Sequence, residues 1–157
     1  MTKGARVPPR WIVTTAWRVH RGLYKASGGR FGLRRPRPGR FGMFRLTTTG
    51  RRSGRERAVI LAYIEDGPAI VTLAMNGWGA GEPAWWLNLR AHPGAHARTP
   101  DGTRAVTGRE ARGAERDRLW QRWREVDPRL DDFAALRGAE TAVVILEDRA
   151  GRPPGHR

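Results

Sequence analysis

Residues 41–74, FGMFRLTTTGRRSGRERAVILAYIEDGPAIVTLA, decide the fold of this chain. Three runs in this stretch are rich in β-branched and aromatic residues, which is typical of strands, and they cover residues 41–49, 57–64 and 69–74. A short cationic loop separates the first two runs, and Asp66-Gly67 makes a tight hairpin turn before the third. The stretch therefore predicts an antiparallel meander of three strands.

The residues after this meander predict helices alternating with further strands. Pro83 is a good first-turn residue for a helix in AWWLNLRAH, which stops before Pro93. An amphipathic helix is expected over 114–126 and a shorter helical piece over 132–137. Two weaker strands and a final buried one are expected at residues 95–99, 103–110 and 141–146. This order argues for an α+β fold, with about six mostly antiparallel strands closing into a small barrel with peripheral helices.

Basic residues are concentrated in the first third of the chain. Residues 1–57 hold sixteen Lys and Arg against one acid, Glu56, so the whole formal net charge of +15 comes from this third. Such an excess indicates an anionic partner. All but two of the thirty cations are Arg, which fits either recognition of phosphate and carboxylate groups or a GC-rich genome.

The chain lacks residues on which much of the chemistry of small proteins depends. It has no Cys, which excludes disulfides, zinc fingers, iron–sulfur clusters and a thiol nucleophile. Its four His show no usable ligand spacing, so no metal site is expected, and its two Ser do not lie in a nucleophile elbow. No apolar run reaches the roughly 18 residues of a membrane span, and no secretory signal is found. We therefore expect a cytoplasmic protein.

Residues 10–26 carry a helical pattern with one apolar and one basic side. Such a helix either docks peripherally on the anionic inner face of a membrane or packs on its own domain with a solvated basic back. The connector that follows, up to residue 40, is rich in Gly, Pro and Arg and too poor in apolar residues to fold alone. We expect three parts: this basic N-terminal part, a barrel domain and a disordered tail, at residues 1–40, 41–148 and 149–157.

The segment TTTGRRSGRER, residues 47–57, is the strongest local candidate for a binding site. A turn with Gly50, Ser53 and Gly54 presents backbone N–H groups, and four Arg bring positive charge to the same point, which suits a phosphate or a polycarboxylate. The alternative is a solvated basic hairpin. If an anion binds there, the Gly-rich segment NGWGAGE, residues 76–82, is the natural second wall.

Three features follow one another along the chain: LTTTGRRSG (46–54), a strand pair divided at Asp66-Gly67, and NG(x)5PAWWLNLRAHP (76–93). In these features the chain resembles the deazaflavin (F420)-dependent nitroreductase and quinone reductase family. The resemblance is collinear from about residue 11 to residue 146. It implies a split β-barrel that binds coenzyme F420, an 8-hydroxy-5-deazaflavin with a phosphate and an oligoglutamate tail, in preference to FMN. Such a tail is an anionic partner of the kind that the Arg-rich loop indicates.

The resemblance also implies which residues contact the cofactor. Residues of the Arg-rich loop hold its phosphate and tail, the start of the second strand lines the deazaflavin, residues after the third strand face the phosphate side, and Trp85 closes the pocket. The implied contacts are Arg51, Arg52, Ser53, Gly54, Arg57, Ala58, Val59, Met75, Asn76, Gly77 and Trp85. The implied reaction is hydride transfer from the reduced deazaflavin to a quinone- or enone-like acceptor.

This chain departs from the nitroreducing members of the family where they carry hydroxyl-bearing side chains. The residues here are Ala62, Met75, Asp127, Leu130 and Phe133, which argues against nitroimidazole reduction. Tyr63 neighbours one of these positions and is a candidate proton donor, although it should point to the opposite face of its strand. A non-catalytic split-barrel protein that binds a deazaflavin, a flavin or a lipid-like ligand stays open as another class. Nucleic-acid binding lacks a recognised motif.

Overall fold

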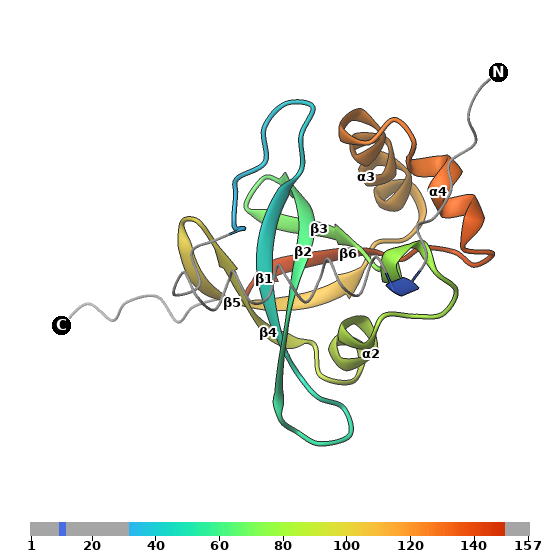
Figure 1. The fold of residues 1–157 in the computed structure, drawn as a ribbon. Helices are drawn as coiled ribbons and strands as arrows, with labels where there is room; N and C mark the ends of the chain where they lie inside the picture. The colour runs from blue at the N-terminus through green and yellow to red at the C-terminus, as the bar shows by residue number, and fades with distance from the viewer. Residues whose placement is uncertain (1–9, 12–31, 150–157) are drawn as a thin grey trace.

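Six strands close into one barrel in the computed structural model, which describes residues 10–11 and 32–149 (Figure 1). The strands are β1 (Gly42–Thr49), β2 (Glu56–Asp66), β3 (Ala69–Leu73), β4 (Gly94–Thr99), β5 (Gly102–Glu110) and β6 (Val143–Asp148). Their order around the barrel is β1-β2-β3-β6-β5-β4, with β4 pairing back to β1, and every pair is antiparallel. The predicted α+β barrel is confirmed.

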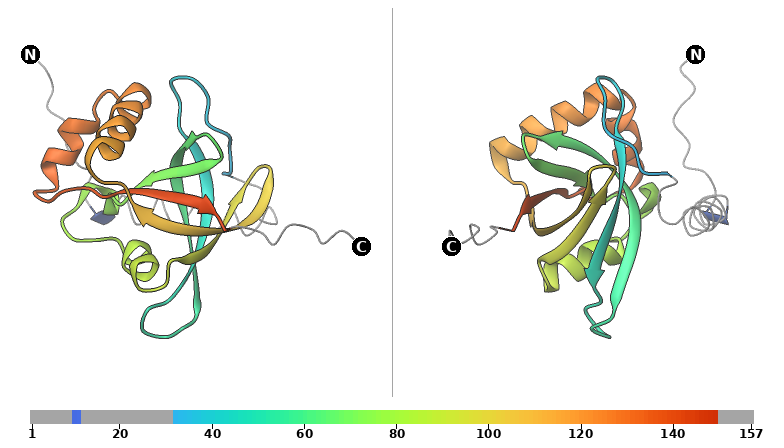
Figure 2. Two further views of the ribbon diagram at one scale, coloured as in Figure 1. Left: turned by 180° about the vertical axis from the view of Figure 1, so that it is seen from behind. Right: turned by 90° about the vertical axis from the view of Figure 1, so that its left-hand side faces the viewer.

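The helices lie outside this barrel on two sides. They are the short 3₁₀ helix η1 (Asn76–Trp78), α2 (Ala84–Ala91), α3 (Gly113–Val126) and α4 (Leu130–Leu136). Two views show α3 and α4 together on one side, with α2 apart from them near the lower part of the barrel (Figures 1 and 2). Helix α4 begins two residues before the predicted piece because the Asp127 carboxylate accepts a hydrogen bond from the Arg129 amide and restarts the helix at Leu130.

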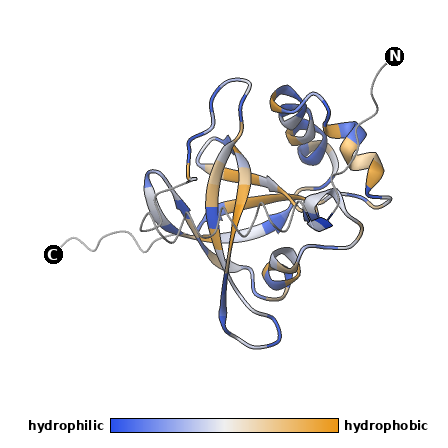
Figure 3. Ribbon diagram, in the orientation of Figure 1, coloured by the Kyte–Doolittle hydropathy of each residue, from blue (hydrophilic) through white to orange (hydrophobic). Residues whose placement is uncertain are grey.

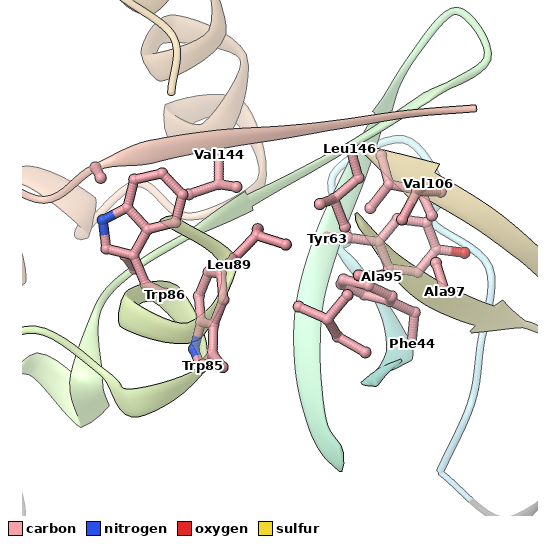
Figure 4. Packing of buried hydrophobic residues seen from close by; sticks show 14 residues of the cluster. Phe44, Tyr63, Trp85, Trp86, Leu89, Ala95, Ala97, Val106, Val144 and Leu146 are labelled. Atoms are coloured by element: carbon pink, nitrogen blue, oxygen red, sulfur yellow. The ribbon is translucent and has the colours of Figure 1, made fainter. Parts of the chain in front are cut away.

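The barrel interior is filled by side chains from all six strands and from α2. Phe44 and Leu46 alternate with half-buried neighbours along β1, as expected for a strand with one face in the core. Figure 4 shows Phe44 with Trp85, Trp86 and Leu89 of α2. Helix α2 comes this close because β5 has a glycine beneath it: a Cβ atom at Gly108 would lie 2.3 Å from Leu89 Cδ2.

A second apolar cluster lies between α3 and the outer face of the sheet. Leu119 and Trp123 of α3 pack with Val71, Val143 and Ile145 of β3 and β6. Both faces of these two strands are therefore covered, which explains their nearly continuous apolar sequence. Figure 3 shows this apolar centre and a hydrophilic tip on the β1–β2 hairpin.

Strand β6 begins two residues later than predicted and ends two residues later. Its ladder starts where Val143 lies opposite Leu73. Thr141 stays outside because its hydroxyl accepts a bond from Arg137 and its carbonyl accepts one from Arg116, at 2.9 and 2.7 Å. At the other end β6 continues to Asp148, and the Arg149 amide still donates to the Ala105 carbonyl at 3.0 Å.

The segments that flank the barrel are described only in part. The connector pairs with β1 through reciprocal backbone bonds between Arg34 and Met43, of 2.9 and 3.1 Å. Most of the predicted basic helix over 10–26 and the predicted tail from 150 onward lie outside the described residues. Among the described helices, none is long and apolar enough to cross a membrane.

Candidate functional site

A pocket of about 510 Å³ lies between the β1–β2 hairpin, the Gly-rich segment 76–82 and the start of α2. Three stretches of chain that are distant in sequence therefore meet at one place. The lining residues are Thr48, Gly50, Arg51, Arg52, Ser53, Arg57, Ala58, Val59, Asn76, Pro83, Ala84, Trp85 and Asn88. Eight of the eleven implied cofactor contacts are among them; Gly54, Met75 and Gly77 are not.

The cationic loop is a turn held by its own backbone. The Gly50 amide donates to the Arg55 carbonyl at 2.8 Å, and the Gly54 amide donates to the Gly50 carbonyl at the same distance. The Ser53 hydroxyl accepts a bond from the Arg55 amide at 3.2 Å. Gly54 has a φ of +69°, which a residue with a Cβ adopts only at a cost. The TTTGRRSG sequence thus builds a fixed loop on which the Arg side chains stand.

Asn88 of α2 ties this loop to the helix, and the sequence analysis missed it. Its Oδ1 accepts bonds from the backbone amide and from Nη1 of Arg51, both at 3.1 Å, and its Nδ2 lies 3.4 Å from Thr48 Oγ1. The side chain is only 5% exposed. The sequence could have indicated this role, because Asn88 is a polar residue among the apolar residues of α2 and a buried side-chain amide needs hydrogen-bond partners.

Four Arg side chains surround the loop without an acidic partner. Arg51, Arg52, Arg55 and Arg57 are exposed, and none of them takes part in an ion pair within residues 32–149. Their positive charge is therefore not neutralised by the described part of the chain. This arrangement suits a phosphate or carboxylate ligand, because guanidinium groups make charge-assisted hydrogen bonds to both.

The opposite side of the pocket is apolar. Pro83 and Trp85 are buried, and Val59 is partly buried against the barrel core. Trp85 packs beside Trp86, with ring centroids 6.2 Å apart, and both belong to the core cluster (Figure 4). A planar apolar group bound here would contact rigid side chains that the core already holds in place.

The Gly-rich segment supplies the third wall in an uncommon backbone conformation. Asn76, Gly77 and Trp78 have φ values of 45°, 60° and 62°, so three consecutive residues are left-handed and two of them are not glycine. Such residues cost about 1–3 kcal/mol each and persist only where their surroundings fix them. The Asn76 carbonyl accepts a hydrogen bond from the Gly79 amide, and the Asn76 side chain donates one from Nδ2 to the Ala80 carbonyl, both at 3.1 Å.

Tyr63 is not brought to this pocket. It lies in the barrel interior, 1% exposed, with its ring 5.1 Å from that of Phe44, and it points to the face opposite Ala62 as expected. Figure 4 shows its hydroxyl directed away from Trp85. Burial, with the Glu65 and Asp101 carboxylates as smaller causes, raises the pKa of Tyr63 to about 12. The candidate proton donor is therefore remote from the pocket and a weak acid.

The other positions at which the sequence predicts a departure from nitroreducing members also lie outside the pocket lining. Ala62, Met75 and Leu130 pack in the outer cluster beneath α3. Phe133 stacks on Trp78, with centroids 6.0 Å apart and an interplanar angle of 14°. In this chain these four positions serve packing, whereas Asp127 accepts a hydrogen bond from the Arg129 amide.

Comparison with known proteins gives one consistent result. A model of the F420H(2)-dependent quinone reductase family matches residues 16–148. An F420H(2)-dependent quinone reductase of Mycobacterium tuberculosis is 30% identical over 135 residues, which cover 84% of this chain and 89% of that protein. A solved structure of an F420-H2 dependent reductase has a TM-score of 0.61 and 28% identity, covering 67% of this chain and 93% of its own. A second, described as a domain-swapped dimer, has a TM-score of 0.65 and 27% identity, covering 89% and 99%.

Proposed function

The chain belongs to the F420H(2)-dependent quinone reductase family, and on this basis we propose that it transfers a hydride from reduced coenzyme F420 to a quinone- or enone-like acceptor. As a family member it is an F420H2-dependent oxidoreductase with coenzyme F420 as its cofactor. The pocket between the cationic loop and α2, in the barrel formed by residues 41–148, is the proposed site.

One observation carries this assignment: the pocket is cationic on one side and apolar on the other. Arg51 and Arg52 have no acidic partner among the described residues, and their loop is fixed in advance by Asn88. This side fits a phosphate and an oligoglutamate tail. The apolar side, with Pro83 and Trp85, fits a planar deazaflavin ring. The residues present therefore fit the cofactor.

When bound, the reduced deazaflavin supplies the hydride. The chain contributes binding and orientation, since Arg51 and Arg52 would hold the anionic end and Trp85 would hold the ring against the barrel. A quinone that accepts a hydride also takes up one proton. This proton balances the one released when the cofactor is oxidised, so no proton is consumed overall. We assign its transfer to water, because Tyr63 is buried away from the pocket and the loop side is exposed.

The acceptor class is proposed from the apolar character of the site. Beside Pro83 and Trp85, the apolar side of the pocket carries Ala58, Val59 and Ala84. An acceptor next to the ring therefore meets no charged group there. The positions at which the sequence departs from nitroreducing members lie outside this lining, and Leu130 and Ala62 pack in the outer cluster, so they supply no hydroxyl to the site. A planar, apolar acceptor that needs few hydrogen bonds suits this environment better than a nitroimidazole does.

Titration of the purified protein with coenzyme F420, FMN, FAD and haem tests the cofactor assignment. Coenzyme F420 is expected to bind most tightly. Reduced cofactor mixed with menadione then tests turnover, followed by recovery of the absorbance of the oxidised cofactor. Tight binding without turnover across a panel of quinones and enones would instead favour the non-catalytic binding protein.

We also propose peripheral contact with the cytoplasmic face of a membrane through the basic segment at residues 10–26, because quinones reside in the bilayer. The support is the sequence pattern alone, as most of this segment lies outside the described residues. Each cation near an anionic surface contributes about 1 kcal/mol. The protein should co-sediment with anionic but not zwitterionic vesicles, and deletion of residues 1–26 should abolish this without abolishing cofactor binding. Sedimentation that survives the deletion, or none at low salt, would contradict the proposal.

A further inference from the structure

Arg137, at the end of α4, is buried beneath the Gly-rich segment 76–82. The residue is only 3% exposed. The guanidinium donates four hydrogen bonds: from Nε to the Gly79 carbonyl at 3.1 Å, from Nη2 to the Gly81 carbonyl at 2.7 Å, and from Nη1 to the Glu140 carbonyl and the Thr141 hydroxyl at 3.2 and 2.9 Å.

All four acceptors of Arg137 are uncharged oxygen atoms. Within the described residues it has no carboxylate partner, unlike Arg116, which lies 3.1 Å from Glu140 on the same stretch of chain. A buried charge without a counter-ion is costly unless hydrogen bonds replace its hydration. An apolar side chain would serve packing at this position with no such cost. The guanidinium therefore points to a role in holding the carbonyl groups that it contacts.

The carbonyl groups held by Arg137 belong to the segment that brings Asn76 to the pocket. Asn76, which lines the pocket, is bonded to the Gly79 amide and the Ala80 carbonyl. Arg137 holds the carbonyl groups on either side of Ala80. Gly79 thus bonds to both Asn76 and Arg137: its amide donates to the Asn76 carbonyl, and its carbonyl accepts from Arg137 Nε.

A second contact joins the same segment to α4. Trp78, with its left-handed backbone, stacks on Phe133, and the Arg129 guanidinium lies 4.9 Å from the centre of the Phe133 ring. Both attachments come from α4 and the residue that follows it, one at Trp78 and the other at Gly79 and Gly81. Helix α4 is therefore the support on which this wall of the pocket is built.

We propose that Arg137 is a positioning residue for the cofactor pocket, which holds segment 76–82 in the conformation that binds coenzyme F420. The inference rests on the proposed function, because it takes the pocket to be the cofactor site. Without the guanidinium, the Gly79 and Gly81 carbonyls lose their donor, so the Gly79 and Ala80 groups that bond to Asn76 are held less firmly, and binding has to restore their order.

Arg137→Met and Arg137→Lys test this proposal, with Arg116→Met as the matched control. Arg116 donates to the Thr141 carbonyl and pairs with Glu140, so its loss disturbs the same chain segment without touching the Gly-rich wall. We expect Arg137→Met to raise the Kd for coenzyme F420 by about 10-fold or more, a change of about 1.4 kcal/mol. Turnover of menadione at saturating cofactor should change less than 2-fold, Arg137→Lys should be intermediate, and Arg116→Met should leave the Kd within about 2-fold.

Hydrogen exchange on the wild-type protein keeps the proposal testable if Arg137→Met does not fold. The amides of Trp78 and Gly79 should exchange slowly before any cofactor is added, because the wall is already ordered. Exchange there as fast as in an unstructured peptide would overturn the proposal, as would equal Kd values for wild type and a folded Arg137 variant. If the wild type itself does not bind coenzyme F420, the proposed function and this inference fall together, whereas binding with no effect of Arg137 removes the inference alone.

Discussion

The arginines of the β1–β2 hairpin and those around α3 differ in their surroundings. Arg118 and Arg122 of α3 both reach the Asp66 carboxylate, at 2.9 and 3.3 Å. Within the described residues Arg51 and Arg52 reach no carboxylate, and the Arg51 guanidinium donates instead to the side-chain oxygen of Asn88. The paired arginines attach α3 to the barrel, whereas the unpaired ones leave their charge available to a ligand. Net charge alone does not show this division; it depends on which arginines meet acids in the fold.

The largest expected effect is on the unpaired arginines. Arg51→Ala combined with Arg52→Ala should weaken binding of coenzyme F420 by at least 10-fold, because charge-assisted bonds contribute about 1.5–3 kcal/mol each. The melting temperature should change little, since both side chains stand on an exposed turn. Arg118→Ala combined with Arg122→Ala is the control with the same change in net charge, and it should leave the Kd nearly unchanged. Equal losses in the two double variants would mean that only total charge matters.

Removal of the Asn88 side chain, which holds the cationic loop, should have the next largest effect on cofactor binding. Asn88→Ala leaves the part-buried Arg51 amide without its acceptor, and the loss of one hydrogen bond costs about 0.5–1.5 kcal/mol of the free energy of unfolding. Cofactor binding should weaken several-fold as the loop loses order. Thr48→Val, which removes only the 3.4 Å contact to Asn88, is the milder control. Calorimetry and fluorescence titration measure the two effects; unchanged binding in Asn88→Ala would show that the loop holds its shape without the helix.

The ion pairs between α3 and Asp66 should respond to acid and not to the cofactor. Hydrogen bonding to Arg118, followed by attraction to Arg118 and Arg122, lowers the pKa of Asp66 against the cost of burial. A depressed folded pKa means that this stabilisation is present above the unfolded pKa of about 3.9 and is lost as the pH falls through the folded value. Asp66→Asn should therefore reduce stability by about 1 kcal/mol at pH 7, and the difference from wild type should vanish in strong acid. A difference that persists there would rule out the ion pairs as its source.

The smallest expected effect is at Tyr63. Its hydroxyl is buried without a hydrogen-bond partner among the described residues, so Tyr63→Phe should leave stability unchanged or raise it by up to about 1 kcal/mol. Cofactor binding and turnover should stay at the wild-type level, because the ring lies away from the pocket. A large loss of turnover with normal folding would return Tyr63 to the reaction as a proton donor.

Much of this fold follows from local sequence patterns. The alternation along β1 and the turn at Asp66-Gly67 predict the meander, and Pro83 predicts where α2 begins. The exact limits of β6 do not follow, because Thr141 is kept out of the ladder by two arginines from α3 and α4. The bond from Arg116 spans 25 residues along the chain, so it leaves no mark on the local pattern.

The site could be predicted only where its motif is continuous. The loop carrying Arg51 and Arg52 stands out because its turn residues and charges are adjacent in sequence. Asn88 and Arg137 act across 37 and 56 or more residues respectively. Each resembles an ordinary helix residue until the fold brings it to its partners. Residues that support a binding loop from elsewhere in the chain are therefore the part that sequence reasoning misses.

Binding of two ligands to two proteins tests the central claim most directly. Wild type and the Arg51→Ala, Arg52→Ala double variant are each titrated with coenzyme F420 and with the same deazaflavin lacking its phosphate and glutamate tail. If the unpaired arginines hold the anionic end, wild type should prefer the complete cofactor by at least 10-fold, and the double variant should lose that preference while its affinity for the truncated ligand stays unchanged. An equal loss of affinity for both ligands would contradict the account, because the arginines would then act on the ring or on the fold.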